Sequence, residues 1–163
     1  MSDSESKPSG GLYEALGRVP SGIYILTVGA GENATGMLAS WVQQAGFEPP
    51  MISLAIKPGR HVAQRIEAGE PFALNVVAEG DKRLLKHFGK GFEPGQPAFE
   101  GIDTEPTAVG APALAAALAV LECRASAGVD ASDHRVVVAH VTGGALRGDA
   151  RPMVHVRNRA DHY

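Results

Sequence analysis

The segment Lys57-Pro58-Gly59-Arg60-His61 gathers two fixed positive charges and one titratable imidazole between an expected strand and an expected helix. Cations in such a position, together with the first N–H groups of a helix, can bind the roughly two negative charges of a phosphate monoester. Charge-assisted hydrogen bonds would then hold the phosphate. The alternative interpretation is that Lys57 and Arg60 are ordinary solvated loop charges.

A second candidate is the pair Asp133-His134, which stands at the start of an apolar, strand-like run. An imidazole beside a carboxylate can keep a proton near neutral pH and act as a general acid or as an oriented hydrogen-bond donor. The alternative is that His134 only helps to form a turn. Because Cys123 lies in an alternating apolar and polar run, we expect it to be a buried small side chain and not a nucleophile.

No metal site is predicted. The six histidines show neither H-E-x-x-H nor H-x-x-E-H spacing, so only a chance approach in space could bring ligands together. They are His61, His87, His134, His140, His155 and His162.

The loop that contains Gly29, Gly31 and Ala34 fits the pattern G-x-G-x-x-G/A, and an apolar run precedes it. A dinucleotide-binding loop must open a helix, because the pyrophosphate sits at the helix N-terminus. Here the loop leads into TGMLASWV, which alternates as a strand does, and the next strand-like run follows too soon for a crossover helix. We therefore interpret the loop as a hairpin turn rich in Gly and Asn.

Apolar periodicity and turn residues predict the elements that must position these groups. A short helix is expected from Leu12 to Leu16, and two more are expected in 61–70 and from Asp81 to Gly89. The stretch 89–114 is expected to be loop, and 114–127 is compatible with a helix or a strand. Strands are expected at about 22–28, 36–42, 51–57, 71–77, 134–146 and 152–156. Many short strands joined by turns favour a closed antiparallel barrel over a parallel sheet.

Composition limits the function further. With 163 residues, a mass of 17.0 kDa, 44% apolar and 20% charged residues and a net charge of -3, the chain is expected to form one domain at 12–163 after a flexible tail at 1–11. Neither a disordered chain nor a nucleic-acid partner is favoured. No apolar run approaches the ~20 residues of a membrane span, and the single cysteine fits a reducing compartment. We expect a cytoplasmic protein.

Four segments, taken in order, resemble the flavin reductase-like family of FMN-binding split barrels over about residues 12–157. The most specific are SWVQQAGFEPP at 40–50, LEC at 121–123 and DHRVVVAHV at 133–141. The chain is similar in particular to the reductase domains fused to flavodiiron proteins. The resemblance implies a mainly β, antiparallel, Greek-key-like split barrel with two to four short helices, and a homodimer in which the second subunit completes the flavin groove.

The resemblance also implies the chemistry. FMN would be bound non-covalently and NAD(P)H would be the co-substrate of a flavin reductase, whose electrons go on to free flavin, a partner oxygenase, ferric iron or an electron-transfer protein. His134 would be the catalytic residue that faces flavin and nicotinamide. His155 stands where many relatives have an aromatic residue, which leaves the substrate pocket open. The expected flavin contacts are Thr35, Met37, Leu38, Ala39, Ser40, Trp41, Val42, Gln43, Lys57, Arg60, His61, Asn75, His87 and Phe88.

Alternatives from other classes remain. The chain could be a flavoprotein electron carrier or FMN-binding module that a protein partner reduces, or, more remotely, a barrel of this type that binds heme. We expect FMN and not FAD, because a cationic segment suits one terminal phosphate and the sequence shows no adenine pocket.

Overall fold

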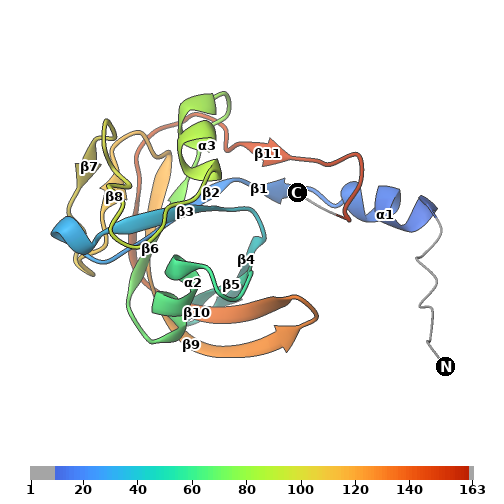
Figure 1. Ribbon diagram of the computed structural model, residues 1–163, viewed down its shortest axis with the longest axis horizontal. Helices are drawn as coiled ribbons and strands as arrows, with labels where there is room; N and C mark the ends of the chain where they lie inside the picture. The colour runs from blue at the N-terminus through green and yellow to red at the C-terminus, as the bar shows by residue number, and fades with distance from the viewer. Residues whose placement is uncertain (1–9, 162–163) are drawn as a thin grey trace.

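Seven antiparallel strands make the main sheet of the computed structural model, which describes residues 10–161 (Figure 1). Their order across the sheet is β3-β2-β6-β9-β10-β5-β4, and every neighbouring pair is antiparallel. The strands are β2 (Tyr24–Val28), β3 (Thr35–Ala39), β4 (Val42–Phe47), β5 (Pro50–Ile56), β6 (Phe72–Val76), β9 (Ala119–Ala131) and β10 (His134–Leu146). The fold is mainly β, as expected.

Short elements complete the described part of the chain. The three α-helices are α1 (Gly10–Gly17), α2 (His61–Glu67) and α3 (Lys82–Gly89), and η1 (Gly31–Asn33) is a 3₁₀ turn. Two small ladders pair β1 (Ser21–Gly22) with β11 (Val154–His155), and β7 (Thr104–Glu105) with β8 (Ala113–Leu114). None of the helices in 10–161 is long and apolar enough to cross a membrane.

The barrel is split, which corrects the expectation of a closed barrel. Strands β3 and β4 are the two edges of the main sheet and do not pair with each other. The single strand expected at 36–42 is two strands, since the chain leaves β3 after Ala39 and turns through Ser40 and Trp41 into β4. β4 then pairs back on β5 through the Glu48-Pro49 turn. The break therefore lies at Ser40-Trp41.

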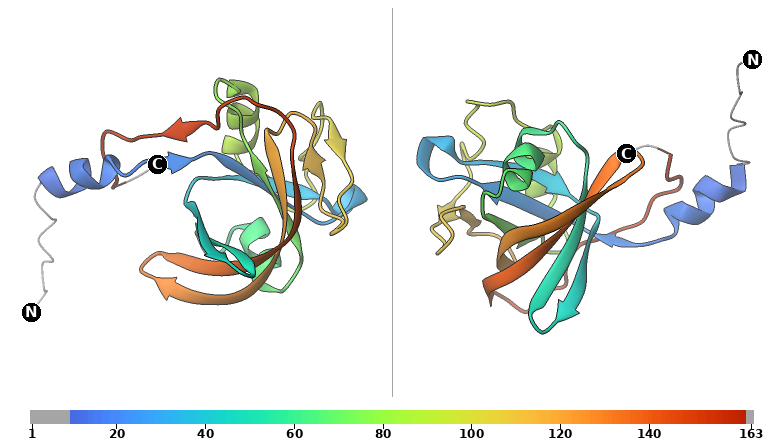
Figure 2. Two further views of the ribbon diagram at one scale, coloured as in Figure 1. Left: turned by 180° about the vertical axis from the view of Figure 1, so that it is seen from behind. Right: turned by 90° about the horizontal axis from the view of Figure 1, so that it is seen from below.

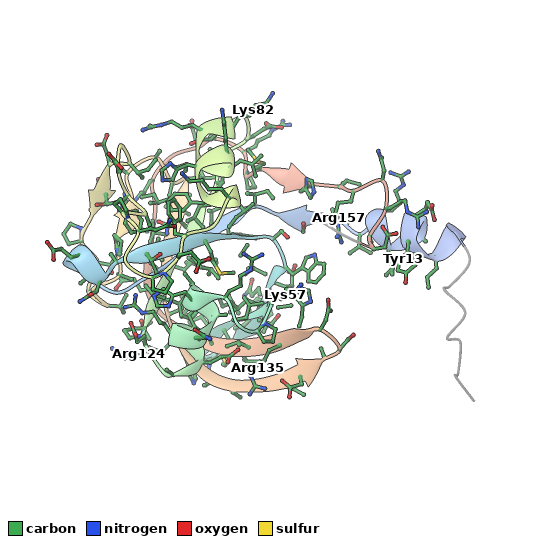
Figure 3. The ribbon with its side chains drawn as sticks, in the orientation of Figure 1. Tyr13, Lys57, Lys82, Arg124, Arg135 and Arg157 are labelled. Carbon is green, nitrogen blue, oxygen red and sulfur yellow. The ribbon has the colours of Figure 1, made fainter. Side chains whose placement is uncertain are left out.

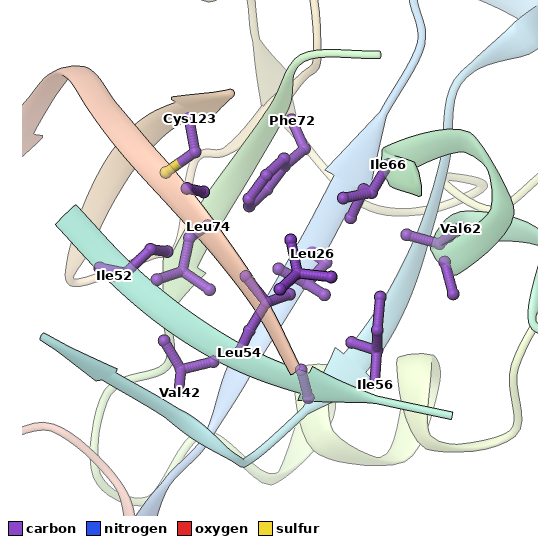
Figure 4. Close-up of a cluster of buried hydrophobic side chains, with 14 of the residues drawn as sticks. Leu26, Val42, Ile52, Leu54, Ile56, Val62, Ile66, Phe72, Leu74 and Cys123 are labelled. Atoms are coloured by element: carbon purple, nitrogen blue, oxygen red, sulfur yellow. The ribbon is translucent and has the colours of Figure 1, made fainter. Parts of the chain in front are cut away.

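Successive residues of the central strands supply two hydrophobic cores, because side chains alternate between the faces of a sheet. Leu26 belongs to a core inside the barrel, closed by Val62 and Ile66 of α2 (Figure 4). Its neighbour Ile25 points into a second core, which holds Leu84 and other residues of α3 and of the 98–118 segment. These two cores hold both sides of β2 and β6 in place.

The structure confirms one further expectation and decides between the two alternatives left open for another segment. The glycine-rich loop is a hairpin between β2 and β3, in which Gly29 has a φ of 76°, a conformation that glycine adopts without strain. It opens no long helix, so it is not a dinucleotide-binding loop. The ambiguous 114–127 stretch contains the start of β9, a strand of 13 residues that pairs with both β6 and β10.

An arm projects from the barrel, formed by 10–22 together with 154–161 (Figures 1 and 2). The Arg157 N–H donates to Gly17 O, and the two backbones are so close that a Cβ on Gly17 would lie 2.4 Å from the Arg157 carbonyl oxygen. Arg159 pairs with Glu14 and lies 5.8 Å from the centre of the Tyr13 ring. Helix α1 begins within the expected tail, whose residues 1–9 lie outside the described residues.

Cys123 gives a first test of this packing. The side chain is fully buried in β9, and burial, reinforced by the nearby Glu122 charge, raises the pKa of the thiol to about 12. Since the thiolate is the reactive form, we expect a disulfide reagent at pH 8 to leave the folded protein unlabelled and to label one thiol per chain in denaturant. Rapid labelling of the native protein would contradict this burial.

Candidate functional site

The turn at Ser40-Trp41 brings the only tryptophan of the chain against the candidate histidine. The ring centres of Trp41 and His134 lie 4.7 Å apart, with the planes inclined by 45°. His134 is the first residue of β10, where Arg135 pairs with Ile56, so it lies beside the end of β5 and its neighbour Lys57. Three elements that are distant in sequence therefore meet at one edge of the break.

Asp133 fixes the orientation of the His134 ring. The Nδ1 atom lies 2.9 Å from Asp133 Oδ1, and an ionised carboxylate only accepts hydrogen bonds, so Nδ1 carries the proton. This bond, helped by the positive charge of Lys57, lowers the pKa of the Asp133 carboxyl. The His134 residue is only 8% exposed, so the imidazole is held in one place beside Trp41.

The arm contributes Arg157, which the sequence analysis did not single out. Its guanidinium carbon lies 5.3 Å from the centre of the Trp41 ring, a cation–π arrangement. Figure 3 shows Arg157 between the barrel and α1. The chain separates the two residues by more than a hundred positions, so no local pattern could have linked them. Their contact depends on the β1–β11 ladder and on α1, which anchor the C-terminal segment.

A cavity of about 460 Å³ opens at the base of the arm, and Trp41 is part of its lining. Half-buried Tyr24 is part of its wall, and burial raises the pKa of its hydroxyl. Four of the expected flavin contacts line it, namely Ser40, Trp41, Val42 and Gln43. An aromatic, partly apolar cavity beside an oriented imidazole is suited to a flat heteroaromatic ring.

A second cavity, of about 620 Å³, holds two of the three expected phosphate contacts. Arg60 and His61 line it from the start of α2, and Lys90 lines it from the loop after α3. The third contact, Lys57, directly follows the last residue of β5 and is not part of the lining of this cavity. Lys57 and Arg60 are exposed, so the cationic segment is available to an anion.

Strand β3 offers polar groups that suit a flavin. As an edge strand it has backbone N–H and C=O groups that pair with no other strand of the sheet. The buried Thr35 hydroxyl has no hydrogen-bond partner among residues 10–161, which is unusual for a buried polar atom. Thr35, Met37 and Ala39 alternate with Leu38, which packs in the second core instead. Ala39 belongs to the core inside the barrel and Met37 packs against that core, so the part of β3 open to a ligand is its unpaired backbone edge.

Three expected contacts have structural roles in the described part of the chain. Asn75 is fully buried: its amide donates to Ile25 O at 3.1 Å and accepts from the Leu114 N–H at 2.8 Å. Phe88 is 1% exposed in the second core, and the His87 ring bonds Ala98 O at 2.8 Å. The structure does not bring Asn75 or Phe88 to the Trp41 cluster.

The remaining histidines form no metal centre in the described residues, where no group of three potential ligands lies close together. His155 is exposed on β11 and pairs with Ser21 through the backbone.

Comparison with known proteins identifies the family of the chain. Residues 16–163 fit the sequence profile described as "Flavin reductase like domain". The chain belongs to the flavin reductase-like family. It is 41% identical over 154 residues to the putative diflavin flavoprotein A 3 of Nostoc sp. and 39% identical to the diflavin flavoprotein A 1 of Synechocystis sp.. Each match covers 93% of this chain and 27% of the relative, so the chain spans about a quarter of their length.

Solved structures share the fold. The NADH:FAD oxidoreductase SgcE6 of Streptomyces globisporus superposes with a TM-score of 0.82 and 26% identity, over 92% of this chain and 89% of that one. A homologue of nitrilotriacetate monooxygenase component B from Mycobacterium thermoresistibile gives a TM-score of 0.80 and 25% identity, over 91% and 82%. The split barrel expected from the sequence is thereby confirmed.

Asn75 provides a test that separates packing from flavin binding. Asn75→Ala leaves the buried Leu114 N–H without its partner and removes the amide bond to Ile25 O, so we expect the free energy of unfolding to fall by about 2–4 kcal/mol. Flavin affinity of the folded protein should stay within about twofold of wild type, a change worth under ~0.5 kcal/mol. Denaturant titration and flavin titration measure the two quantities. The exposed Asn158→Ala is the control, and a selective loss of flavin affinity in Asn75→Ala would give Asn75 the cofactor role.

Proposed function

We propose that this protein is an NAD(P)H-dependent flavin reductase that binds the FMN moiety of a flavin nucleotide, non-covalently, at the break between β3 and β4. The observation that carries the proposal is the cluster of Trp41 with His134, Asp133 and the end of β5, beside a cavity lined by the Ser40–Gln43 corner. When bound, the flavin accepts a hydride from the nicotinamide and passes the electrons onward.

The protein's own groups would orient the ring and provide charge. Backbone groups of 37–42 and the Thr35 hydroxyl would bind its polar edge, and Trp41 would limit its position on one side. His134, held by Asp133, can offer a proton or a positive charge where negative charge develops on the ring. Lys57, Arg60 and His61 would bind the phosphate by charge-assisted hydrogen bonds.

The family supports the enzyme class, and the names of similar proteins support the co-substrate. SgcE6 is an NADH:FAD oxidoreductase, and the other neighbour is related to a monooxygenase component. The acceptor of the electrons would be free flavin, an oxygenase or an electron-transfer protein. A free, buried thiol is compatible with the reducing cytoplasm that we expect.

The rival function is an electron carrier that a protein partner reduces. Anaerobic mixing of the flavin-loaded protein with NADH and then with NADPH, followed at the flavin band near ~450 nm, decides between the two. Loss of the flavin absorbance at least as fast as steady-state turnover with NADH or NADPH supports the reductase. Slow bleaching with both nicotinamides, with fast reduction by a flavoprotein donor, supports the carrier.

His134 is the residue that we expect to control the rate. His134→Ala should leave flavin affinity nearly unchanged and slow flavin reduction about 10-fold to 1000-fold, the range for one positioned acid or charge-stabilising group. Stopped-flow spectroscopy measures this directly. His140→Ala removes an exposed histidine from the same strand and serves as the matched control. If reduction is unaltered while thermal stability falls, His134 is a structural turn residue.

The arm supports a homodimer. Five of the eight large, exposed hydrophobic residues in 10–161 lie on it: Leu12, Leu16, Val19, Val154 and Val156. Apolar surface gathered on a projecting element is expensive to leave in water, and a two-fold axis can bury it against a second copy. The cavity beside Trp41 includes Val19 and Val154, so the same contact would wall the flavin site.

Light scattering tests this assembly. We expect a mass about twice 17.0 kDa for wild type. Leu12→Glu with Leu16→Glu should shift the protein toward monomer, because both side chains are 46% exposed on one face of α1. Val129→Glu, at a 62% exposed apolar residue away from the arm, is the control. A wild-type monomer that binds flavin tightly would show that one subunit suffices.

A further inference from the structure

Trp41 lies in the break of the main sheet, outside both β3 and β4. Its carbonyl oxygen accepts the Ala55 N–H at 2.9 Å, so its backbone is held on the β5 side. The residue is only half-buried, and it belongs to neither of the two hydrophobic cores. Core packing therefore does not fix the indole, whose position depends on the groups that contact the ring.

Side chains from two distant segments contact that ring. The His134 ring centre lies 4.7 Å from the Trp41 ring centre, and the Arg157 guanidinium carbon lies 5.3 Å from it. Both separations are contact distances, since aromatic pairs meet at about 4.5–7 Å and a cation acts on a ring within about 6 Å. Arg157, Trp41 and His134 thus form a continuous row of contacts that runs from the arm to the candidate site.

Backbone contacts within the arm hold the segment that carries Arg157. The Arg157 N–H donates to Gly17 O at 3.1 Å, and the Ala160 N–H donates to Tyr13 O at 3.0 Å, so 157–160 is bound to α1 at both ends. Glycine at position 17 permits this approach, because a Cβ there would lie 2.4 Å from the Arg157 carbonyl oxygen. The backbone of the arm therefore sets where the Arg157 guanidinium lies.

We propose that Arg157 is a positioning residue that holds Trp41 against His134 and so fixes the imidazole at the site. Asp133 binds Nδ1 of that imidazole and Trp41 lies beside its ring, so one of its two restraints depends on the arm. A small displacement of a positioned group is enough to slow a reaction. This role rests on the proposed function, in which His134 supports charge on the flavin, and adds the arm to the parts that control the rate.

Fluorescence of the full-length protein, before and after flavin is added, tests the contact, because Trp41 is the only tryptophan of the chain. Arg157→Gln removes the cation, whereas Gly17→Ala keeps the cation and displaces the segment that carries it. We expect both variants to emit at longer wavelength than wild type and to be quenched more strongly by acrylamide, because water replaces the arm beside the indole. Arg18→Gln removes an exposed arginine from the same arm and is the matched control, with the emission of wild type.

Stopped-flow reduction of the flavin-loaded protein is the second measurement. At saturating nicotinamide we expect Arg157→Gln and Gly17→Ala to slow flavin reduction about 2-fold to 30-fold, the range that one cation–π contact can account for. Arg157→Lys keeps a cation and should recover part of both the rate and the emission. Arg18→Gln should be reduced as fast as wild type.

The two measurements separate the possible failures. Unchanged emission in both Arg157→Gln and Gly17→Ala overturns the proposal, since the arm then does not hold the indole. Altered emission with an unaltered rate also overturns it, because Trp41 would move without consequence for His134. If wild type is reduced by neither nicotinamide, the proposed function fails instead, and the emission still decides whether Arg157 holds Trp41.

Discussion

The failure of β3 and β4 to pair is the constraint on which the site depends. A closed barrel would satisfy every strand edge internally, whereas this sheet ends in two edges joined by the two residues Ser40 and Trp41. Unpaired edges are a liability for a soluble fold unless something binds them. A ligand that carries both hydrogen-bonding groups and a flat apolar ring would meet that need, and four of the expected contacts, Ser40 to Gln43, line the cavity at the break.

The rigidity of that break is maintained from both sides of the sheet. Leu26 and Ile25, adjacent in β2, anchor two different cores, so β2 cannot shift without disturbing both. On the outer side, the amide of Asn75 joins β6 to β2 and to the Leu114 backbone. The position of β3 is thus set by residues that never reach the ligand. For this reason Asn75 is expected to affect the free energy of unfolding and not flavin affinity.

The sequence could predict those features that depend on local pattern. The helix expected from Asp81 to Gly89, the hairpin at Gly29 and the buried Cys123 follow from residue type and spacing, and the structure confirms each of them. Long-range features were less accessible. Periodicity could not reveal that 36–42 is broken at Ser40, nor that Asn75 points into a core. Arg157 reaches the Trp41 ring only through tertiary contacts, so no short motif could have identified it.

In the proposed function the two cavities would hold different parts of the flavin, the ring beside Trp41 and the phosphate beside Arg60. In the proposed function, Trp41 and His134 would contact a ring whose charge changes during reaction, and the Asp133 contact holds the His134 ring in one orientation there. Arg60 would contact a phosphate, for which a permanent cation suffices. Contacts to the phosphate at the second cavity would then position the ring at the first cavity without changing the reaction of the ring. Separation of the anchoring groups from the reacting groups would also let one barrel retain its reaction while its nucleotide preference changes.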